Sequence, residues 1–236
     1  GRKYTAMGLL AWYDLTGDKK TLASVRRLIN HLMTQVGDGK ADIVQCGIYK
    51  GMPSCSVIIP VLRLYEFTRD PRYLAFARYI VARGESTEGP QLIGKADVPV
   101  ALRWPHPANW YTKENGMKAY EMMSCYMGLL RLYHITHEES LLRAVETAVS
   151  HIMQEEINIA GSGSAFECWY GGNHLQTLPA AHTMETCVTV TWMQLCAELL
   201  KVTKDTKYAD EIERSAYNAL IASMRADGQK IAKYSP

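Results

Sequence analysis

Four short segments of the chain resemble one another, and they constrain the fold more than any other feature. They are "LTGDKKTL" at 15–22, "FTRDPRYL" at 67–74, "ITHEESLL" at 135–142 and "VTKDTKYA" at 202–209. In each segment a Thr follows an apolar residue, and an acidic residue lies two positions after the Thr. This pattern is typical of a joint between two helices, where the Thr ends one helix and the carboxylate caps the free N–H groups of the next. The sequence therefore predicts four helical hairpins.

The helices on the two sides of a joint differ in polarity. Before the third joint, residues 116–136 carry few charges and are apolar on nearly all sides, whereas residues 139–156 have a single apolar stripe. A helix that is apolar all round is buried, and a striped helix covers others. Inner and outer helices that alternate at this repeat length are typical of an α/α toroid. We predict an all-α fold, an incomplete portion of an (α/α)6 barrel with about eight helices.

Three long segments connect the predicted hairpins, at 39–54, 84–116 and 157–182. Loops this long are uncommon in a compact domain unless they are functional. In a toroid such loops gather at one mouth, and we place the ligand site there. Six-hairpin rings need more helices than these, so we expect residues 1–236 to be a fragment of one catalytic domain that continues beyond the C-terminus and before the N-terminus.

Charge and hydropathy exclude two classes of protein. The formal net charge is +2, and Lys and Arg are scattered, so the basic stripe of a nucleic-acid-binding protein is absent from the sequence. No apolar run reaches the roughly 18 residues of a membrane span. The six cysteines include no CxxC pair and leave the redox compartment undecided.

Glu167 is a candidate general acid in the third long loop. It lies between Phe166 and Cys168 and precedes Trp169 and Tyr170. Apolar surroundings disfavour the charged carboxylate and raise its pKa, as a general acid requires. Flanking aromatic rings also suit the C–H faces of sugars. The alternative interpretation is a loop glutamate in an ordinary hydrogen bond.

Glu185 and Cys187 form a candidate metal site in "HTMETC". On a regular helix, residues two apart point to nearly opposite sides, so the pair can share a metal only if a helix begins between them or just before. Thr183 is a helix-start signal, and a thiol at a helix N-terminus ionises to the thiolate that binds metals. The alternative is a capping Glu and a buried Cys, because two donors alone do not make a zinc site.

The combination "GSGSAFECWYGG … HTMETC … KYADEIERSAYNALIASM … YSP" resembles glycoside hydrolase family 127, the β-L-arabinofuranosidase-like enzymes. The resemblance implies an (α/α)6 barrel with a zinc ion, and a retaining mechanism in which a zinc-bound cysteine is the nucleophile. It implies that Glu185 and Cys187 bind zinc, that Glu167 is the general acid/base and that Glu213 contacts the sugar. We expect Trp169 and Tyr170 to hold the sugar as well. The family's nucleophile element would lie beyond residue 236, since no cysteine follows Cys196.

One departure limits what the resemblance implies about substrate. The arabinofuranosidases have sugar-binding histidines in their early repeats, and the matching stretches "YTAMGLL", "MPSCSVII" and "NGMKAYEMM" contain none. We expect a zinc-dependent retaining hydrolase that removes L-arabinofuranose or a related plant-glycan sugar from an oligosaccharide or polysaccharide, in the periplasm or outside the cell. The fragment alone would be inactive. The alternatives are a non-catalytic carbohydrate-binding toroid and another α/α-barrel enzyme, such as a sugar epimerase or polysaccharide lyase.

Overall fold

The computed structural model describes residues 1–103, 118–175 and 183–233. Within them, the helices of nine or more residues are α1 (Arg2–Thr16), α2 (Lys19–Gln35), α4 (Ile58–Thr68), α5 (Pro71–Gly84), α6 (Ala119–Thr136), α7 (Glu139–His151), α9 (Thr186–Thr203) and α10 (Lys207–Ser215). Short helices are α3 (Met52–Cys55) and α8 (Gly172–Leu175), with 3-10 turns η1 (Tyr49–Gly51) and η2 (Val100–Leu102). Two π-helical turns, η3 (Ile152–Glu156) and η4 (Ala216–Leu220), extend α7 and α10. The described residues form isolated bridges but no strand, which confirms the all-α prediction.

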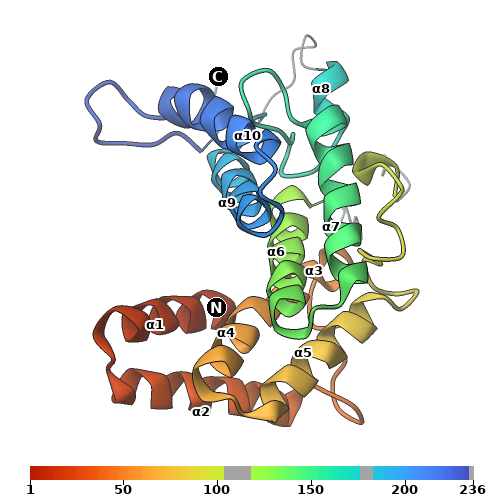
Figure 1. Cartoon of the computed structure of the whole chain (residues 1–236), viewed down its shortest axis with the longest axis vertical. Coiled ribbons are helices and arrows are strands. Elements are labelled where there is room, and N and C mark those ends of the chain that lie inside the picture. The colour runs from red at the N-terminus through yellow and green to blue at the C-terminus, as the bar shows by residue number, and fades with distance from the viewer. Residues whose placement is uncertain (104–117, 176–182, 234–236) are drawn as a thin grey trace.

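The eight long helices form an arc of four hairpins (Figure 1). The inner helices α1, α4, α6 and α9 pack side by side in that order, and each packs against its outer partner α2, α5, α7 or α10. Side chains of the inner helices, such as Leu64, Met122 and Trp192, are fully buried. The predicted part of an α/α toroid is therefore confirmed.

The four joints have one geometry. Each inner helix ends in its Thr, whose hydroxyl donates to the carbonyl four residues earlier at 2.7 to 3.0 Å. The following residue adopts the left-handed conformation and closes the helix with its N–H. The carboxylates of Asp18, Asp70 and Asp205 then accept N–H groups of the next helix. Glu138 makes no such side-chain cap, so the prediction of an acidic cap is wrong at the third joint.

Gly128 lets the inner helices α4 and α6 approach closely. A Cβ atom built on Gly128 would overlap the Cγ2 atom of Ile58, whereas a Cβ on the exposed helical Gly8 meets nothing within 4 Å. We expect Gly128→Ala to lower the free energy of unfolding by about 1–3 kcal/mol through overpacking. The same substitution at Gly8 should raise it by roughly 0.5–1 kcal/mol, because alanine is the better helix former. Urea unfolding of both variants checks this, and equal effects would contradict it.

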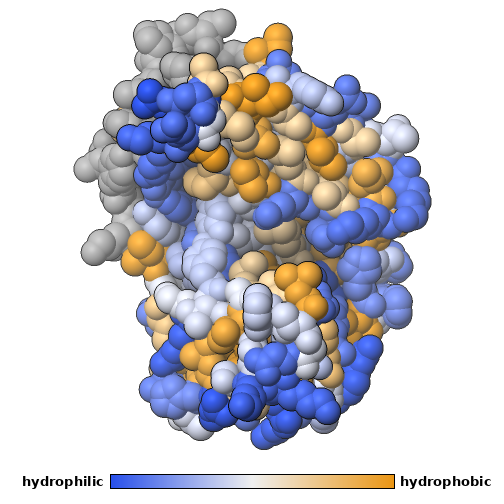
Figure 2. Space-filling view, turned by 90° about the vertical axis from the view of Figure 1, so that its left-hand side faces the viewer, coloured by the Kyte–Doolittle hydropathy of each residue, from blue (hydrophilic) through white to orange (hydrophobic). Residues whose placement is uncertain are grey.

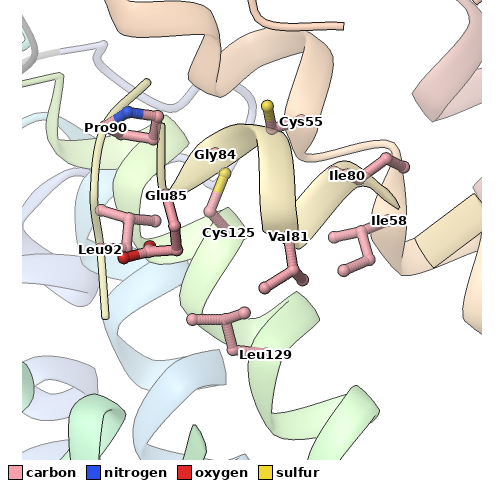
Figure 3. A pocket seen from close by; sticks show the side chains of 10 residues that line it. All are labelled: Cys55, Ile58, Ile80, Val81, Gly84, Glu85, Pro90, Leu92, Cys125 and Leu129. Carbon is pink, nitrogen blue, oxygen red and sulfur yellow. The ribbon is translucent and has the colours of Figure 1, made fainter. Parts of the chain in front are cut away.

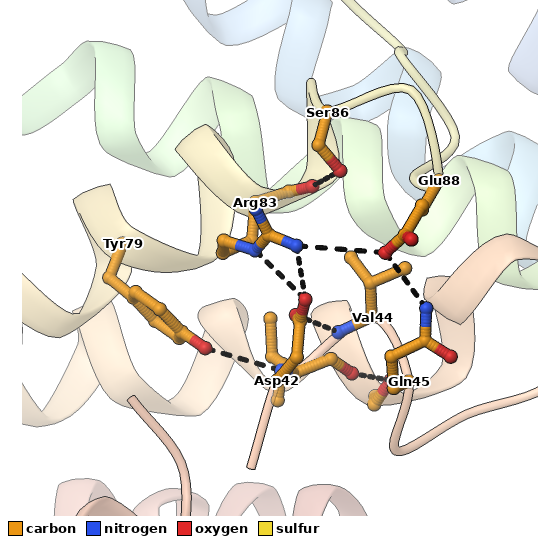
Figure 4. Close-up of polar contacts among 9 residues, drawn as sticks. Asp42, Val44, Gln45, Tyr79, Arg83, Ser86 and Glu88 are labelled. Atoms are coloured by element: carbon orange, nitrogen blue, oxygen red, sulfur yellow. Dashed lines mark hydrogen bonds and ion pairs between the residues drawn. The ribbon is translucent and has the colours of Figure 1, made fainter. Parts of the chain in front are cut away.

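The first long loop is fixed to the end of α5 by polar contacts (Figure 4). Asp42 accepts from Arg83 Nε at 3.0 Å and from the backbone N–H of Val44 at 3.0 Å. The hydrogen bond from Arg83 lowers the pKa of Asp42 below its ordinary value. Gln45 donates to Glu88 at 2.9 Å. These contacts hold the loop at the same end of the arc as the N-termini of the inner helices.

One side of the arc is open. α1 at one end and α9 with α10 at the other are separated by a hollow, and apolar side chains lie on both sides of it (Figure 2). Exposed apolar residues on these elements are Trp12, Leu15, Val190, Tyr217 and Ile221. Among the described residues, no helix has both the length and the apolar character needed to cross a membrane.

Candidate active site

Three inner helices begin at the same end of the arc, which we call the mouth: the N-terminal ends of α1, α6 and α9, with loop 157–172 and segment 231–233. Tyr4 of α1 donates to the hydroxyl of Tyr120 of α6 at 2.6 Å, and Lys3 lies 3.4 Å from Glu121. Segment 231–233 reaches the start of α9, where Thr186 N–H donates to the carbonyl of Lys233 at 3.0 Å.

Glu167 lies in a strained two-residue turn at the mouth. Ala165 and Cys168 exchange two backbone hydrogen bonds of 2.9 Å, and the residues between them, Phe166 and Glu167, have φ of 47° and 70°. Two central residues with positive φ make a type I′ turn, which normally contains Asn and Gly. Non-glycine residues in this conformation store strain, and such strain clusters at functional sites.

Two ammonium groups flank the Glu167 carboxylate, so the predicted apolar surroundings are wrong, and the positive charges favour its ionised form. Lys118, the residue before α6, pairs with Oε2, and Lys233 lies 3.1 Å from Oε1. The Lys118 ammonium also lies over the ring of Tyr49, 5.2 Å from its centroid. Burial lowers the pKa of Lys118 below its ordinary value, against the opposing effect of Glu185. The backbone carbonyl of Glu167 accepts from Ala119 N–H at 3.0 Å, so this loop and α6 are joined at the candidate catalytic residue.

Glu185 is a buried carboxylate, and one of its oxygens accepts no hydrogen bond in the described part of the chain. It is the N-cap residue of α9, with extended φ and ψ of −62° and 130°, and its side chain does not cap the helix. The residue is 1% exposed. Oε2 accepts a long hydrogen bond of 3.4 Å from Ser164, whereas Oε1 has no hydrogen bond in the described part of the chain. The Lys233 ammonium lies 3.9 Å from Oε1, so one lysine bridges Glu167 and Glu185. Burial raises the pKa of Glu185, despite the opposing effect of Lys118 and Lys233.

Cys187 lies in the first turn of α9, one residue after its start, and is exposed. The helix therefore begins between Glu185 and Cys187, which is the geometry that the metal-site hypothesis requires. The backbone N–H of Val188 in this first turn favours the thiolate, but the prediction that the thiol ionises more readily is wrong, because other effects outweigh it. Desolvation by neighbouring side chains and the nearby Glu185 carboxylate raise the pKa of the Cys187 thiol above its ordinary value.

A zinc ion fits part of this donor set. A buried carboxylate oxygen without a partner is unfavourable unless a cation or donor satisfies it. Glu185 and Cys187 supply one oxygen and one sulfur, both of which zinc accepts. The described residues contain no cluster of three or more His, Cys, Asp or Glu that could hold a metal. Two ligands of a zinc site would thus come from this part of the chain.

The other predicted sugar-binding residues occupy different surroundings. Trp169 is fully buried, and its indole N–H has no hydrogen bond in the described part of the chain. Tyr170 is half-buried beside it. Glu213 lies on the exposed side of α10, where it lines an open depression with Asp210 and Tyr217. Its contact with a sugar stays a prediction, as does that of Trp169, whose ring offers no exposed surface here.

Glu156 is a buried carboxyl at the mouth that the sequence interpretation missed. It ends the π-helical turn η3, is 0% exposed and accepts hydrogen bonds from Tyr170, Gly171 and Gly172 N–H groups. Burial raises its pKa to about 7 against the effect of these three donors. In the sequence, "QEE" at the end of an outer helix is typical of solvent-exposed residues. The only local sign that Glu156 is buried is that the apolar stripe of this helix ends after Ile152.

A second pocket lies between α4, α5 and α6 (Figure 3). Its volume is about 30 Å³ and its lining is mostly apolar, with the thiols of Cys55 and Cys125. Burial raises the pKa of Cys55 to about 12 and that of Cys125 well above its ordinary value. The pocket is too small for a sugar and its thiols are inert, so the mouth remains the candidate site.

A family model described as the β-L-arabinofuranosidase, GH127 catalytic domain matches residues 3–236. The chain belongs to glycoside hydrolase family 127. A search of curated proteins gives no match. The family membership accounts for the helical repeat.

Solved structures show the same fold. The family 127 β-L-arabinofuranosidase from Geobacillus stearothermophilus T6 is 20% identical to this chain, with a TM-score of 0.72. The match covers 100% of this chain and 38% of the Geobacillus chain. A second family 127 β-arabinofuranosidase is 21% identical with a TM-score of 0.75, covering 100% and 35%. The family 76 α-mannanase from Bacteroides thetaiotaomicron is 15% identical with a TM-score of 0.68, covering 99% and 60%. This chain thus spans little more than a third of the length of the two arabinofuranosidases.

Proposed function

We propose that this family 127 chain is part of a zinc-dependent retaining glycoside hydrolase that acts on side chains of plant or microbial glycans. The observation that carries the proposal is the meeting of Glu167 and Glu185 on one ammonium group at the mouth, beside Cys187. Loop 157–172 supplies a candidate general acid/base and the start of α9 supplies a candidate metal ligand within one site. The family's arabinofuranosidases supply the reaction class.

Glu167 is the proposed general acid/base. Its turn holds the carboxyl group at the mouth, 30% exposed, where a glycosidic oxygen can reach it. Protonated Glu167 would donate its proton to the leaving oxygen, and the carboxylate would later take a proton from water. Lys118 and Lys233 favour the carboxylate, which is the form that takes the proton from water.

Glu185 and Cys187 are the proposed zinc ligands of this chain. A zinc ion would supply positive charge that lowers the pKa of a bound thiol and fixes its position. The buried Oε1 of Glu185, which accepts no hydrogen bond in the described residues and lies 3.9 Å from the Lys233 ammonium, would bind the ion. The remaining ligand and the nucleophilic cysteine would come from residues after 236, so we propose that residues 1–236 alone are inactive. Two more hairpins would close the ring over the open apolar side.

The sugar need not be L-arabinofuranose. Where the arabinofuranosidases have histidines, this mouth has Tyr4 and Tyr120, joined by a hydrogen bond of 2.6 Å, and Ser56, which donates to Glu121 at 3.2 Å. These hydroxyl groups and Lys118 offer a different set of donors, so we propose a related sugar of plant glycans. Such glycans lie outside bacterial cells, which supports a periplasmic or extracellular location.

The test is product analysis with the full-length protein. It would be incubated with a panel of 4-nitrophenyl glycosides, including the α- and β-L-arabinofuranosides, and with arabinose-containing plant oligosaccharides. The proposal predicts release of a free sugar that first appears with the anomeric configuration of the substrate, seen by NMR. An unsaturated product would identify a lyase instead, and sugar binding without turnover would identify a binding module.

A further inference from the structure

The Glu156 side chain is enclosed where loop 157–172 returns to the end of α7. Its Oε2 accepts from the backbone N–H groups of Tyr170 at 3.0 Å and Gly172 at 3.2 Å, and both carboxyl oxygens lie 3.0 Å from the N–H of Gly171. The three donors are consecutive. One carboxyl group therefore fixes three residues of backbone.

The loop is closely fitted to this end of α7. Cβ atoms built on Gly163 and Gly172 would lie 2.9 Å and 3.1 Å from the Glu156 carbonyl oxygen, closer than ordinary contacts allow. Glycine at both positions lets two parts of the loop approach the Glu156 backbone closely. The carboxyl group of Glu156 accepts from all three of these N–H groups.

No cation accompanies Glu156 in the described part of the chain, although buried carboxylates are normally paired with one. Its hydrogen bonds all come from the segment that begins three residues after Glu167. On the other side, Ala119 N–H holds the carbonyl of Glu167 at 3.0 Å. The strained turn that carries Glu167 is thus held between α6 and Glu156.

We propose that Glu156 is a positioning residue, whose carboxyl group binds three successive N–H groups and thereby fixes the loop that presents Glu167 at the mouth. The proposal deepens the proposed function, because it rests on Glu167 as the acid/base for its effect on turnover. Its effect on the loop does not depend on that role.

The experiment compares three variants of the full-length protein by amide hydrogen exchange. Glu156→Met keeps the side-chain length but removes both acceptors, and Glu156→Gln keeps one acceptor oxygen. Because the pKa of Glu156 is raised to about 7, the neutral amide is a close mimic of its uncharged form. Glu155→Gln is the control, since Glu155 is adjacent but 30% exposed and pairs with His151 at 3.4 Å.

We expect Glu156→Met to lower the protection of residues 169–172 by about tenfold or more, because three buried N–H groups lose their acceptor. Peptides from α2 and α4 should keep wild-type protection. Glu156→Gln should keep most of the wild-type protection of residues 169–172, and Glu155→Gln should show the same protection as the wild type. On an oligosaccharide substrate, whose leaving group needs the proton of Glu167, Glu156→Met should lower kcat at least tenfold with little change in KM, since small displacements of a catalytic group are costly.

Wild-type loop protection in Glu156→Met would overturn the proposal. The proposal would also be overturned if Glu156→Gln folds but loses loop protection as fully as the Met variant does. If the Met variant does not fold, protection retained in Glu156→Gln supports the acceptor role and protection lost overturns it. Failure of the Glu167 assignment looks different, because the exchange results would hold while Glu167→Gln kept its turnover.

Discussion

Glu167→Gln lowers the turnover of the full-length enzyme on an oligosaccharide by at least about a hundredfold, within the range that general acid–base catalysis contributes. The amide keeps the shape of the side chain but cannot donate or accept the proton in the reaction. Lys118 and Lys233 can still contact the amide oxygen, so substrate binding should change little. Initial rates and a binding isotherm for the same oligosaccharide measure the two effects separately.

The size of the loss in Glu167→Gln should depend on the leaving group of the substrate. A 4-nitrophenolate departs without protonation, whereas a sugar alkoxide does not. The loss in the glycosylation step should therefore be much smaller on 4-nitrophenyl glycosides than on oligosaccharides. A matched control is Glu66→Gln, because Glu66 is 31% exposed and pairs with Arg131, much as Glu167 is 30% exposed and pairs with Lys118. Equal losses in both variants, or unchanged turnover in Glu167→Gln, would remove Glu167 from the mechanism.

The second large effect is on stability. Trp192 is fully buried in α9, and its indole N–H donates to Glu211 of α10 at 3.2 Å. Trp192→Ala should lower the free energy of unfolding by about 3–5 kcal/mol, because it leaves a large cavity between an inner helix and its outer partner. Trp192→Phe fills most of that space and should cost about 1–2 kcal/mol for the lost hydrogen bond.

Denaturant unfolding followed by circular dichroism measures these changes. Lys201→Ala on the same helix is the control, since Lys201 is 65% exposed and its ion pair with Glu198 is a surface contact. Its effect should stay within about 0.5 kcal/mol. A Trp192→Ala variant as stable as this control would show that α9 and α10 do not pack as described.

The helical hairpins could be predicted from the sequence because their signals are local. A Thr at the end of an inner helix, the left-handed residue after it and the Asp at the start of the next helix act within five residues. The start of α9 between Glu185 and Cys187 was predictable for the same reason. The third joint differs from this prediction, because Glu138 has the expected position but its side chain does not cap the next helix.

The site depended on contacts that local patterns do not contain. Nothing in "AFEC" indicates a type I′ turn, since Phe and Glu are poor residues for positive φ. The pairing of Glu167 with Lys118 joins residues 49 positions apart, and Glu156 reaches N–H groups 14 to 16 positions on. The Cys187 pKa was predicted in the wrong direction because desolvation and the Glu185 carboxylate outweigh the N–H donor of the helix start, and the local pattern does not report burial.

The central claim is that the start of α9 is a metal site, and elemental analysis of the full-length protein tests it most directly. We predict about one zinc per chain in the wild type, lost in Cys187→Ser and retained in Cys46→Ser, which removes another exposed thiol. Loss of zinc only with Cys187 would make Glu185 and Cys187 part of the metal centre. A wild-type protein without zinc, or zinc retained in Cys187→Ser, would contradict the claim.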